Sequence, residues 1–198
     1  DLAGAVDTLV ASADFAERFA RFTNAELNDA PATSAAVDPI YYLAKHVITN
    51  DKPWSDLFVG GYQVKASGDA MTVTTDPNGL GYFRTEAWRK RYAGNEPEGL
   101  MLVGAFRLLA NTPGLELSAS VGTPDDDRTA SGRSAPSCKG CHFDAWFALD
   151  KVAKLLPKKT GSDDAVSFTP PAAGPQQLFG KSIADDKALL TTLVGSDG

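Results

Sequence analysis

The chain has 198 residues, of which 43% are hydrophobic and 22% are charged. This balance suits a globular domain with a sizeable core and excludes a disordered or fibrous chain. The formal net charge is −6 and the isoelectric point is about 4.9, which argues against a nucleic acid or an anionic membrane surface as the partner. The longest helix-like apolar stretch, Leu100 to Ala110, is interrupted by Arg107, so the sequence predicts no membrane span.

The start of the chain and its cysteine content bear on its origin. The first residue is Asp1 rather than Met and no apolar leader precedes it, so we expect either a removed signal peptide or a piece of a longer chain. Two cysteines are too few for a disulfide framework in a fold of this size. Because they are close in the sequence, we expect them to act together at one site.

Helical spacing dominates the first part of the sequence. Apolar residues recur at this spacing over Leu2–Val10 and again over Phe15–Phe22, which predicts two helices with a break near Ala13. Asp14 and Glu17 have the spacing of a capping box at the start of the second helix. Asp38-Pro39 is typical of a helix start and predicts a third helix that ends at Asn50.

The middle of the chain changes period. Apolar and polar residues alternate on both sides of Ser67-Gly68-Asp69, which predicts a β-hairpin within residues 60–75. A short helix with Trp88 and Tyr92 and a buried helix over Glu98–Ala110 are expected next. The stretch Gly122–Ser137 is rich in Asp, Gly, Ser and Thr and predicts a long surface loop.

The last third of the chain is expected to be helical with one irregular segment. A helix is predicted over Phe143–Leu156, an irregular segment wrapping the surface over Thr169–Pro175, and a final helix over Asp185–Val194. The predicted fold class is mainly α: a single globular domain over residues 1–198, with a small β-hairpin and a long loop before a haem-attachment helix. A sub-boundary is expected near residues 112–137, and residues 169–198 form a tail with the terminal helix.

One motif carries specific chemistry. Cys138-Lys139-Gly140-Cys141-His142 is C-x-x-C-H, the attachment signature of c-type haem. On a helical turn, residues at i, i+3 and i+4 share a face, so Cys138, Cys141 and His142 can approach one edge of a porphyrin. The sequence therefore predicts one covalent haem c, with two thioether bonds and His142 as the proximal iron ligand.

Two other chemistries use similar residues. A zinc site would need two further ligands, and adjacent Cys141 and His142 do not easily bind one ion together. A redox thiol pair would be expected to follow a strand in a βαβ pattern, which this chain lacks. Covalent haem is the preferred interpretation.

The second axial ligand is less determined by the sequence. Neither His nor Met follows His142, so the candidates are His46, Met71 and Met101, with lysines as remote alternatives. A sixth coordination position that is open, or that a partner protein fills, also agrees with the sequence. Met101, on a helix predicted to be buried, also suits a plain core residue.

Supporting residues can be named around the motif. Arg128 and Arg133 are the nearest cations for the haem propionates. Aromatic and aliphatic side chains are expected to supply an apolar shell: Phe143, Trp146, Phe147, Leu149, Trp88 and Phe106. The acidic run at residues 125–127 suggests a solvated face or a docking site for a basic redox partner.

Several segments resemble one protein family in collinear order. The segments are Val6–Phe22, His46–Trp54 with Asp56–Phe58 and Tyr62, Glu98–Met101, Ser137–His142 and Phe147–Asp150. They are similar to the "xxLLxSxxFAERFARFW", "NDRPFTELLTADYT", Gly-Leu-Leu and "SCxxCHxxxDPxGFALE" stretches of the large planctomycete-type cytochrome c domain proteins. This chain has Phe143-Asp144-Ala145-Trp146 where the family has its Asp-Pro pair. The resemblance implies a secreted or periplasmic haem protein.

These observations predict an extracytoplasmic monohaem c-type cytochrome that carries single electrons between protein redox partners. We expect His142 and His46 to hold the iron, with Met101 and Met71 as alternatives to His46. Two other functions stay open: a haem enzyme or gas sensor with an open sixth position, and a haem subunit of a larger redox assembly or filament.

Overall fold

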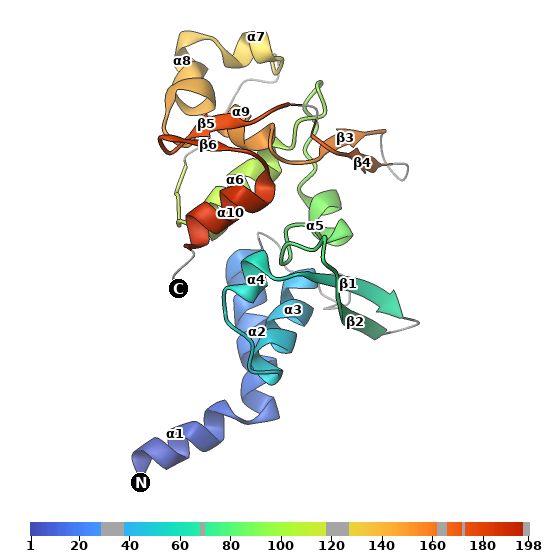
Figure 1. Cartoon of the computed structure of the whole chain (residues 1–198), viewed down its shortest axis with the longest axis vertical. Helices are drawn as coiled ribbons and strands as arrows, with labels where there is room; N and C mark the ends of the chain where they lie inside the picture. Colours follow the sequence, from blue (N-terminus) through green and yellow to red (C-terminus); the bar gives the residue numbers. More distant parts are fainter. Residues whose placement is uncertain (29–37, 68–69, 118–126, 162–165, 172, 196–198) are drawn as a thin grey trace. The chain divides into compact units, whose positions relative to one another are not determined.

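The structure is a computed structural model that describes residues 1–28, 38–67, 70–117, 127–161, 166–171 and 173–195 (Figure 1). The chain divides into two compact units, Asp1–Trp88 and Arg89–Gly198. The predicted mainly α fold class is confirmed, and the strands form small two-stranded antiparallel sheets. The assignment of all 198 residues to one cytochrome domain stays a prediction.

The first unit contains the N-terminal helices and one hairpin. Its elements are α1 (Leu2–Val10), α2 (Ala13–Leu27), α3 (Pro39–Thr49), α4 (Asp56–Val59), β1 (Tyr62–Ser67) and β2 (Ala70–Thr75). A further short helix, α5 (Glu86–Arg91), spans the boundary between the units. The predicted break near Ala13, the third helix and the hairpin are all present.

The start of α2 differs from the expected capping box. Ser12 is the N-cap, and its side chain accepts a hydrogen bond from the Phe15 N–H at 3.1 Å. A hydroxyl at this position satisfies one of the free N–H groups of the first turn. The capping box predicted from Asp14 and Glu17 is therefore wrong, and the Glu17 carboxylate instead binds Tyr41 and Lys45 of α3.

The core of the first unit lies between α2 and α3, which pack together. Ala16 and Ala20 of α2 are buried, as are Leu43 and Val47 of α3. Small side chains on one helix let the larger apolar side chains of the other approach closely. The hairpin pairs Tyr62 with Thr75 at its open end and also packs on α3.

The second unit carries the C-x-x-C-H motif. Its elements are α6 (Leu102–Asn111), α7 (Ala130–Arg133), α8 (Pro136–Lys139), the π-helical turn η2 (Gly140–Asp144), α9 (Leu149–Ala153), β3 (Lys158–Thr160), β4 (Ser167–Thr169), β5 (Gln176–Leu178), β6 (Lys181–Ile183) and α10 (Asp186–Val194). Helix α6 packs on α9, and Ala105, Leu109 and Val152 are buried in their helices. This packing forms the apolar base on which the motif rests.

Several predicted elements of the second unit have different bounds. The helix expected over Phe143–Leu156 is interrupted, because η2 ends at Asp144 and the next helix starts at Leu149. The described part of the expected loop over Gly122–Ser137 contains α7 and the start of α8, and residues 122–126 lie outside the described residues. The hairpins β3–β4 and β5–β6 were not predicted.

No helix in the described part of the chain combines the length and the apolar character needed to cross a membrane.

Candidate functional site

The three chemical groups of the motif come together at one cavity of the second unit. Cys138 lies in α8, and Cys141 and His142 lie in η2; all three line a cavity of about 350 Å³. The turn η2 is closed by the Ala145 N–H, which donates to the Gly140 carbonyl at 2.8 Å. Such a wide turn is rare in helices and is frequent at functional sites.

The other walls of the cavity are mostly apolar. They are formed by Leu102, Val103, Phe106, Leu117 and Leu149, with Glu96 and Ser137 as the polar members among the described lining residues. The volume lies within the roughly 300–1,000 Å³ range of ligand pockets. A flat apolar ligand attached at the motif would therefore contact hydrocarbon on α6 and α9.

The two cysteines carry free thiols. Cys141 is exposed and Cys138 is half-buried. The Sγ of Cys138 lies 3.6 Å from the Oγ of Ser137. Both sulfurs border the cavity, so each is available for a bond to a ligand there.

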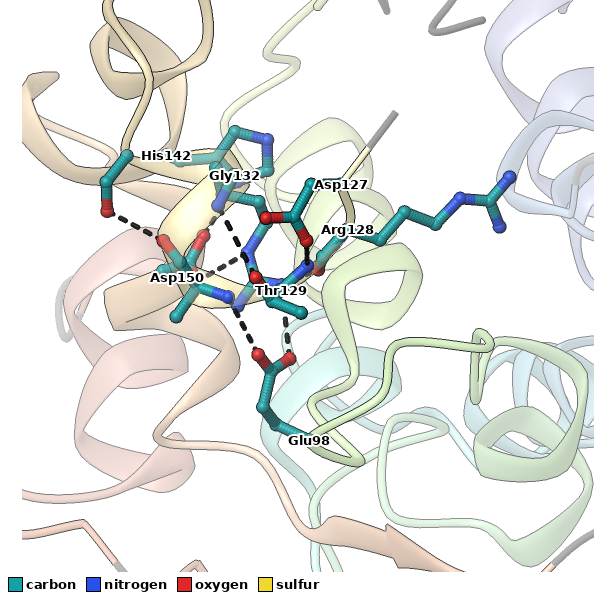
Figure 2. A network of polar contacts seen from close by, with 10 residues as sticks. Glu98, Asp127, Arg128, Thr129, Gly132, His142 and Asp150 are labelled. Atoms are coloured by element: carbon teal, nitrogen blue, oxygen red, sulfur yellow. Dashed lines mark hydrogen bonds and ion pairs between the residues drawn. The ribbon is translucent and has the colours of Figure 1, made fainter. Parts of the chain in front are cut away.

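His142 is oriented by a buried carboxylate. Its Nδ1 lies 2.7 Å from Oδ2 of Asp150, whose side chain is 1% exposed. Figure 2 shows the two side chains facing each other at one end of a polar network. A neutral imidazole that donates from Nδ1 has its lone pair on Nε2, so this arrangement prepares Nε2 to bind a metal.

Asp150 is itself held by a buried arginine. Its Oδ1 accepts hydrogen bonds from Nε and Nη2 of Arg133, at 3.0 and 2.8 Å. Nη1 of Arg133 lies 3.2 Å from Oε2 of Glu98 and also donates to the Arg128 carbonyl. Oε1 of Glu98 accepts from the Ala130 N–H, at the first residue of α7, at 2.7 Å. Figure 2 also includes Thr129, Gly132 and Asp127 in the network.

The network keeps its carboxylates ionised. Burial raises the pKa of Asp150, but the hydrogen bonds from His142 and Arg133 outweigh it, so the pKa of Asp150 lies below its usual value. Burial likewise raises the pKa of Glu98, and the contacts with the Ala130 N–H and Arg133 lower it further than burial raises it. A buried charge of this kind is tolerated because it is paired and hydrogen-bonded.

A strained turn leads from the motif to Asp150. Ala148, the fully buried N-cap of α9, has a φ of 28° and a ψ of 82°. A positive φ is costly for a residue with a Cβ, on the order of 1–3 kcal/mol. Helix α9 begins directly after this residue, and Asp150 in its first turn contacts His142.

Glu96 is an unusual polar group in the cavity wall. Its Oε2 is buried and has no hydrogen-bond partner. Desolvation raises the pKa of Glu96, against the opposing effect of Arg133, Lys159 and Arg128. The cavity therefore has one carboxyl group that holds a proton more tightly than an ordinary glutamate does.

His46, the candidate for the second axial ligand, lies in the first unit on α3. Its ring meets the Tyr62 ring edge-on with centroids 5.1 Å apart. Nδ2 of Asn50 lies 3.3 Å from Nδ1 of His46 and donates to the His46 carbonyl at 2.8 Å, which fixes the amide orientation. Asn50 therefore donates to Nδ1, and the neutral ring carries its proton on Nε2.

The two methionine candidates have different surroundings. Met71 is half-buried on β2 of the first unit. Met101 is fully buried at the N-cap of α6 in the second unit. It directly precedes Leu102 and Val103 of the cavity wall, but the described lining residues do not include it.

The expected supporting residues are only partly found at the cavity. Phe106 and Leu149 line it, whereas Trp146 is 55% exposed and Trp88 is a core residue of the first unit. Arg133 is buried between Asp150 and Glu98 and is paired with both carboxylates, and its expected contact with a propionate stays a prediction. Arg128 is exposed and available for that contact.

The donor set fits a covalently attached haem. Two thiols and an imidazole with a prepared Nε2 share a cavity that has apolar walls. No group of three or more His, Cys, Asp or Glu among the described residues is arranged to hold a metal ion by itself. The sequence interpretation missed Asp150, Glu98 and Glu96, although Asp150 ends the Phe147–Asp150 segment.

Comparisons of the chain with protein-family models, with curated proteins and with solved structures give no match.

Proposed function

We propose that this chain is an extracytoplasmic monohaem c-type cytochrome that carries single electrons between protein redox partners. The observation that supports the proposal most is the shared cavity of Cys138, Cys141 and His142. Haem c supplies a one-electron iron centre whose potential depends on its axial ligands and on the polarity around it. The covalent attachment points to the periplasm or the extracellular space, where such proteins mature.

Each residue of the motif has a distinct task in this proposal. Cys138 and Cys141 form the two thioether bonds that fix the group in the cavity. His142 binds the iron through Nε2, because its Nδ1 is engaged by Asp150. The side chains of Leu102, Phe106 and Leu149 line the cavity and would exclude water from a group held there and lower the local dielectric.

The first experiment tests the covalent attachment. The full chain, exported in a host with c-type maturation machinery, is expected to gain the mass of one haem and to keep it after denaturation. The double variant Cys138→Ser/Cys141→Ser should have the mass of the bare polypeptide, whereas the control Ser131→Ala, at an exposed serine of α7 that is not among the described cavity-lining residues, should load normally. A wild-type protein without added mass and without visible absorbance would contradict the proposal, and bound zinc in that protein would favour the alternative metal site.

The second axial ligand is proposed to be His46, with Met101 and Met71 as the alternatives. An imidazole lowers the reduction potential relative to a thioether. Ligation through Nε2 of His46 requires its proton to move to Nδ1, which breaks the contact with Asn50. His46→Ala is expected to convert a low-spin ferric spectrum to a high-spin one, and an unchanged spectrum would remove His46 from the iron.

A haem enzyme or gas sensor is the second candidate function. The observation that favours it is Glu96, a carboxyl group in the cavity wall whose Oε2 is buried without a hydrogen-bond partner, because a carboxyl group so placed can exchange a proton with a bound ligand. Carbon monoxide binding to the reduced wild-type protein would support this candidate. A reduced spectrum that carbon monoxide leaves unchanged supports the electron carrier.

A further inference from the structure

We propose that Asp150 is a positioning residue that sets the strength of the proximal ligand and holds the midpoint potential of the centre low. This inference rests on the proposed function, because it concerns the same site. It adds Asp150, which lies outside the C-x-x-C-H motif, as a residue that controls the midpoint potential. The geometry that carries it is the contact of Nδ1 of His142 with Oδ2 of Asp150 at 2.7 Å.

The short contact between His142 and Asp150 has a charged acceptor that is shielded from solvent. The Asp150 side chain is 1% exposed and the His142 side chain 24% exposed. Hydrogen bonds to an ionised acceptor are roughly twice as strong as those between neutral groups, and a low dielectric strengthens them further. The carboxylate therefore draws the Nδ1 proton toward itself and increases the electron density that His142 offers at Nε2.

The two oxygens of Asp150 have separate partners. Arg133 donates twice to Oδ1, at 3.0 and 2.8 Å, and leaves Oδ2 to His142. The guanidinium thus fixes the carboxylate in position while it neutralises part of its charge. Glu98 on the other side of Arg133 at 3.2 Å draws some of that positive charge away, so Oδ2 keeps negative charge with which to accept the hydrogen bond from His142.

An electron-rich proximal ligand favours the more highly charged oxidation state of the iron. Residues that orient a metal-binding histidine through its other nitrogen change metal affinity or activity by about 10- to 100-fold when they are replaced. Stabilisation of the oxidised form alone by tenfold corresponds to about 59 mV for one electron. Weakening the Asp150 contact is therefore expected to raise the midpoint potential by at least this amount.

The test compares the midpoint potentials of the loaded full-length wild type and of Asp150→Asn. The amide keeps the shape of the side chain but is a much weaker acceptor, so we expect the upward shift and a change in the ferric EPR g-values. Asp144→Asn is the matched control. Asp144 lies two residues after His142, is 57% exposed and contacts Lys139 at 3.3 Å, so this variant removes the same charge without changing a bond to His142.

A second variant separates the hydrogen bond from the charge. Asp150→Asn leaves Arg133 buried without its carboxylate, which destabilises the folded protein, whereas Asp150→Asn/Arg133→Gln removes one charge of each sign. The proposal expects the upward shift in this double variant as well. Wild-type protein without covalent haem would overturn the proposed function, whereas loaded variants that shift no more than Asp144→Asn would overturn this inference alone.

Discussion

A network of charged side chains is found in each unit of the molecule, and the two networks differ in burial. In the first unit, Glu17 binds Lys45 and Arg21, each at 2.6 Å, and all three side chains are at least 30% exposed. In the second unit, Arg133 and Asp150 are 7% and 1% exposed. The distances are similar, so burial decides what each network contributes.

This difference assigns the networks different roles. An exposed pair contributes up to about 1 kcal/mol and weakens with salt. A buried pair costs free energy to desolvate, and the loss of one partner leaves an uncompensated charge. The exposed network ties two helices together, whereas the buried network fixes the position of His142. Four substitutions test this comparison.

Asp150→Ala is expected to have the largest effect. It leaves the Arg133 guanidinium buried without its carboxylate, which should lower the free energy of unfolding by about 3–5 kcal/mol. Urea denaturation followed by circular dichroism measures the change. A loss below 1 kcal/mol would mean that the buried network contributes no more to the free energy of unfolding than the exposed one.

Gly132→Ala should destabilise the segment that carries Arg133. A Cβ at Gly132 would lie 2.6 Å from the Cβ of Asp127 and would also meet the Asp127 backbone. We expect this overpacking to lower the free energy of unfolding by about 1–3 kcal/mol. The same denaturation measurement applies. Gly174→Ala, where a Cβ meets nothing within 4 Å, is the control, and equal losses in both variants would contradict the explanation.

Glu17→Gln should cost about 1 kcal/mol at pH 7 because its network is exposed. Hydrogen bonds from Lys45 and Tyr41 lower the pKa of Glu17 to about 2. Since the pKa is lower in the folded state, the stabilisation is present above the ordinary value of 4.5 and is lost as the pH falls toward 2. The difference between wild type and variant should therefore vanish in acid, and a difference that persists at pH 2 would show that packing causes it.

Lys139→Met should change stability least. Lys139 and Asp144 are 52% and 57% exposed at a separation of 3.3 Å, so we expect a change within about 0.5 kcal/mol. Thermal unfolding at low and high salt is the measurement. A larger loss of stability that depends on salt would contradict the comparison, because an exposed ion pair would then contribute as much stability as a buried one.

Local signals predicted most of the helices. Pro39 starts α3 as expected, and Asp185 caps the last helix by accepting from the Ala188 N–H. The capping box at Asp14 was wrong because Ser12, two residues earlier, offered a competing cap. These elements depend on neighbours within one turn, which a sequence displays directly.

The site was only partly predictable. The motif residues are close in sequence, so their common cavity could be expected. Asp150 depends on Arg133, 17 residues earlier, and Arg133 on Glu98, 35 residues earlier, and no local spacing encodes such pairs. The break after η2 was missed because the positive φ of Ala148 is imposed by tertiary packing.

The exposed position of Cys141 has a consequence for turnover under the proposed function. Cys141 is exposed while Cys138 is half-buried, so a group attached to both residues would have one edge open to the solvent on the Cys141 side. A partner could then approach that edge to within tunnelling range through a brief collision. Electron exchange would need no opening of the protein, and its rate would follow the frequency of productive encounters.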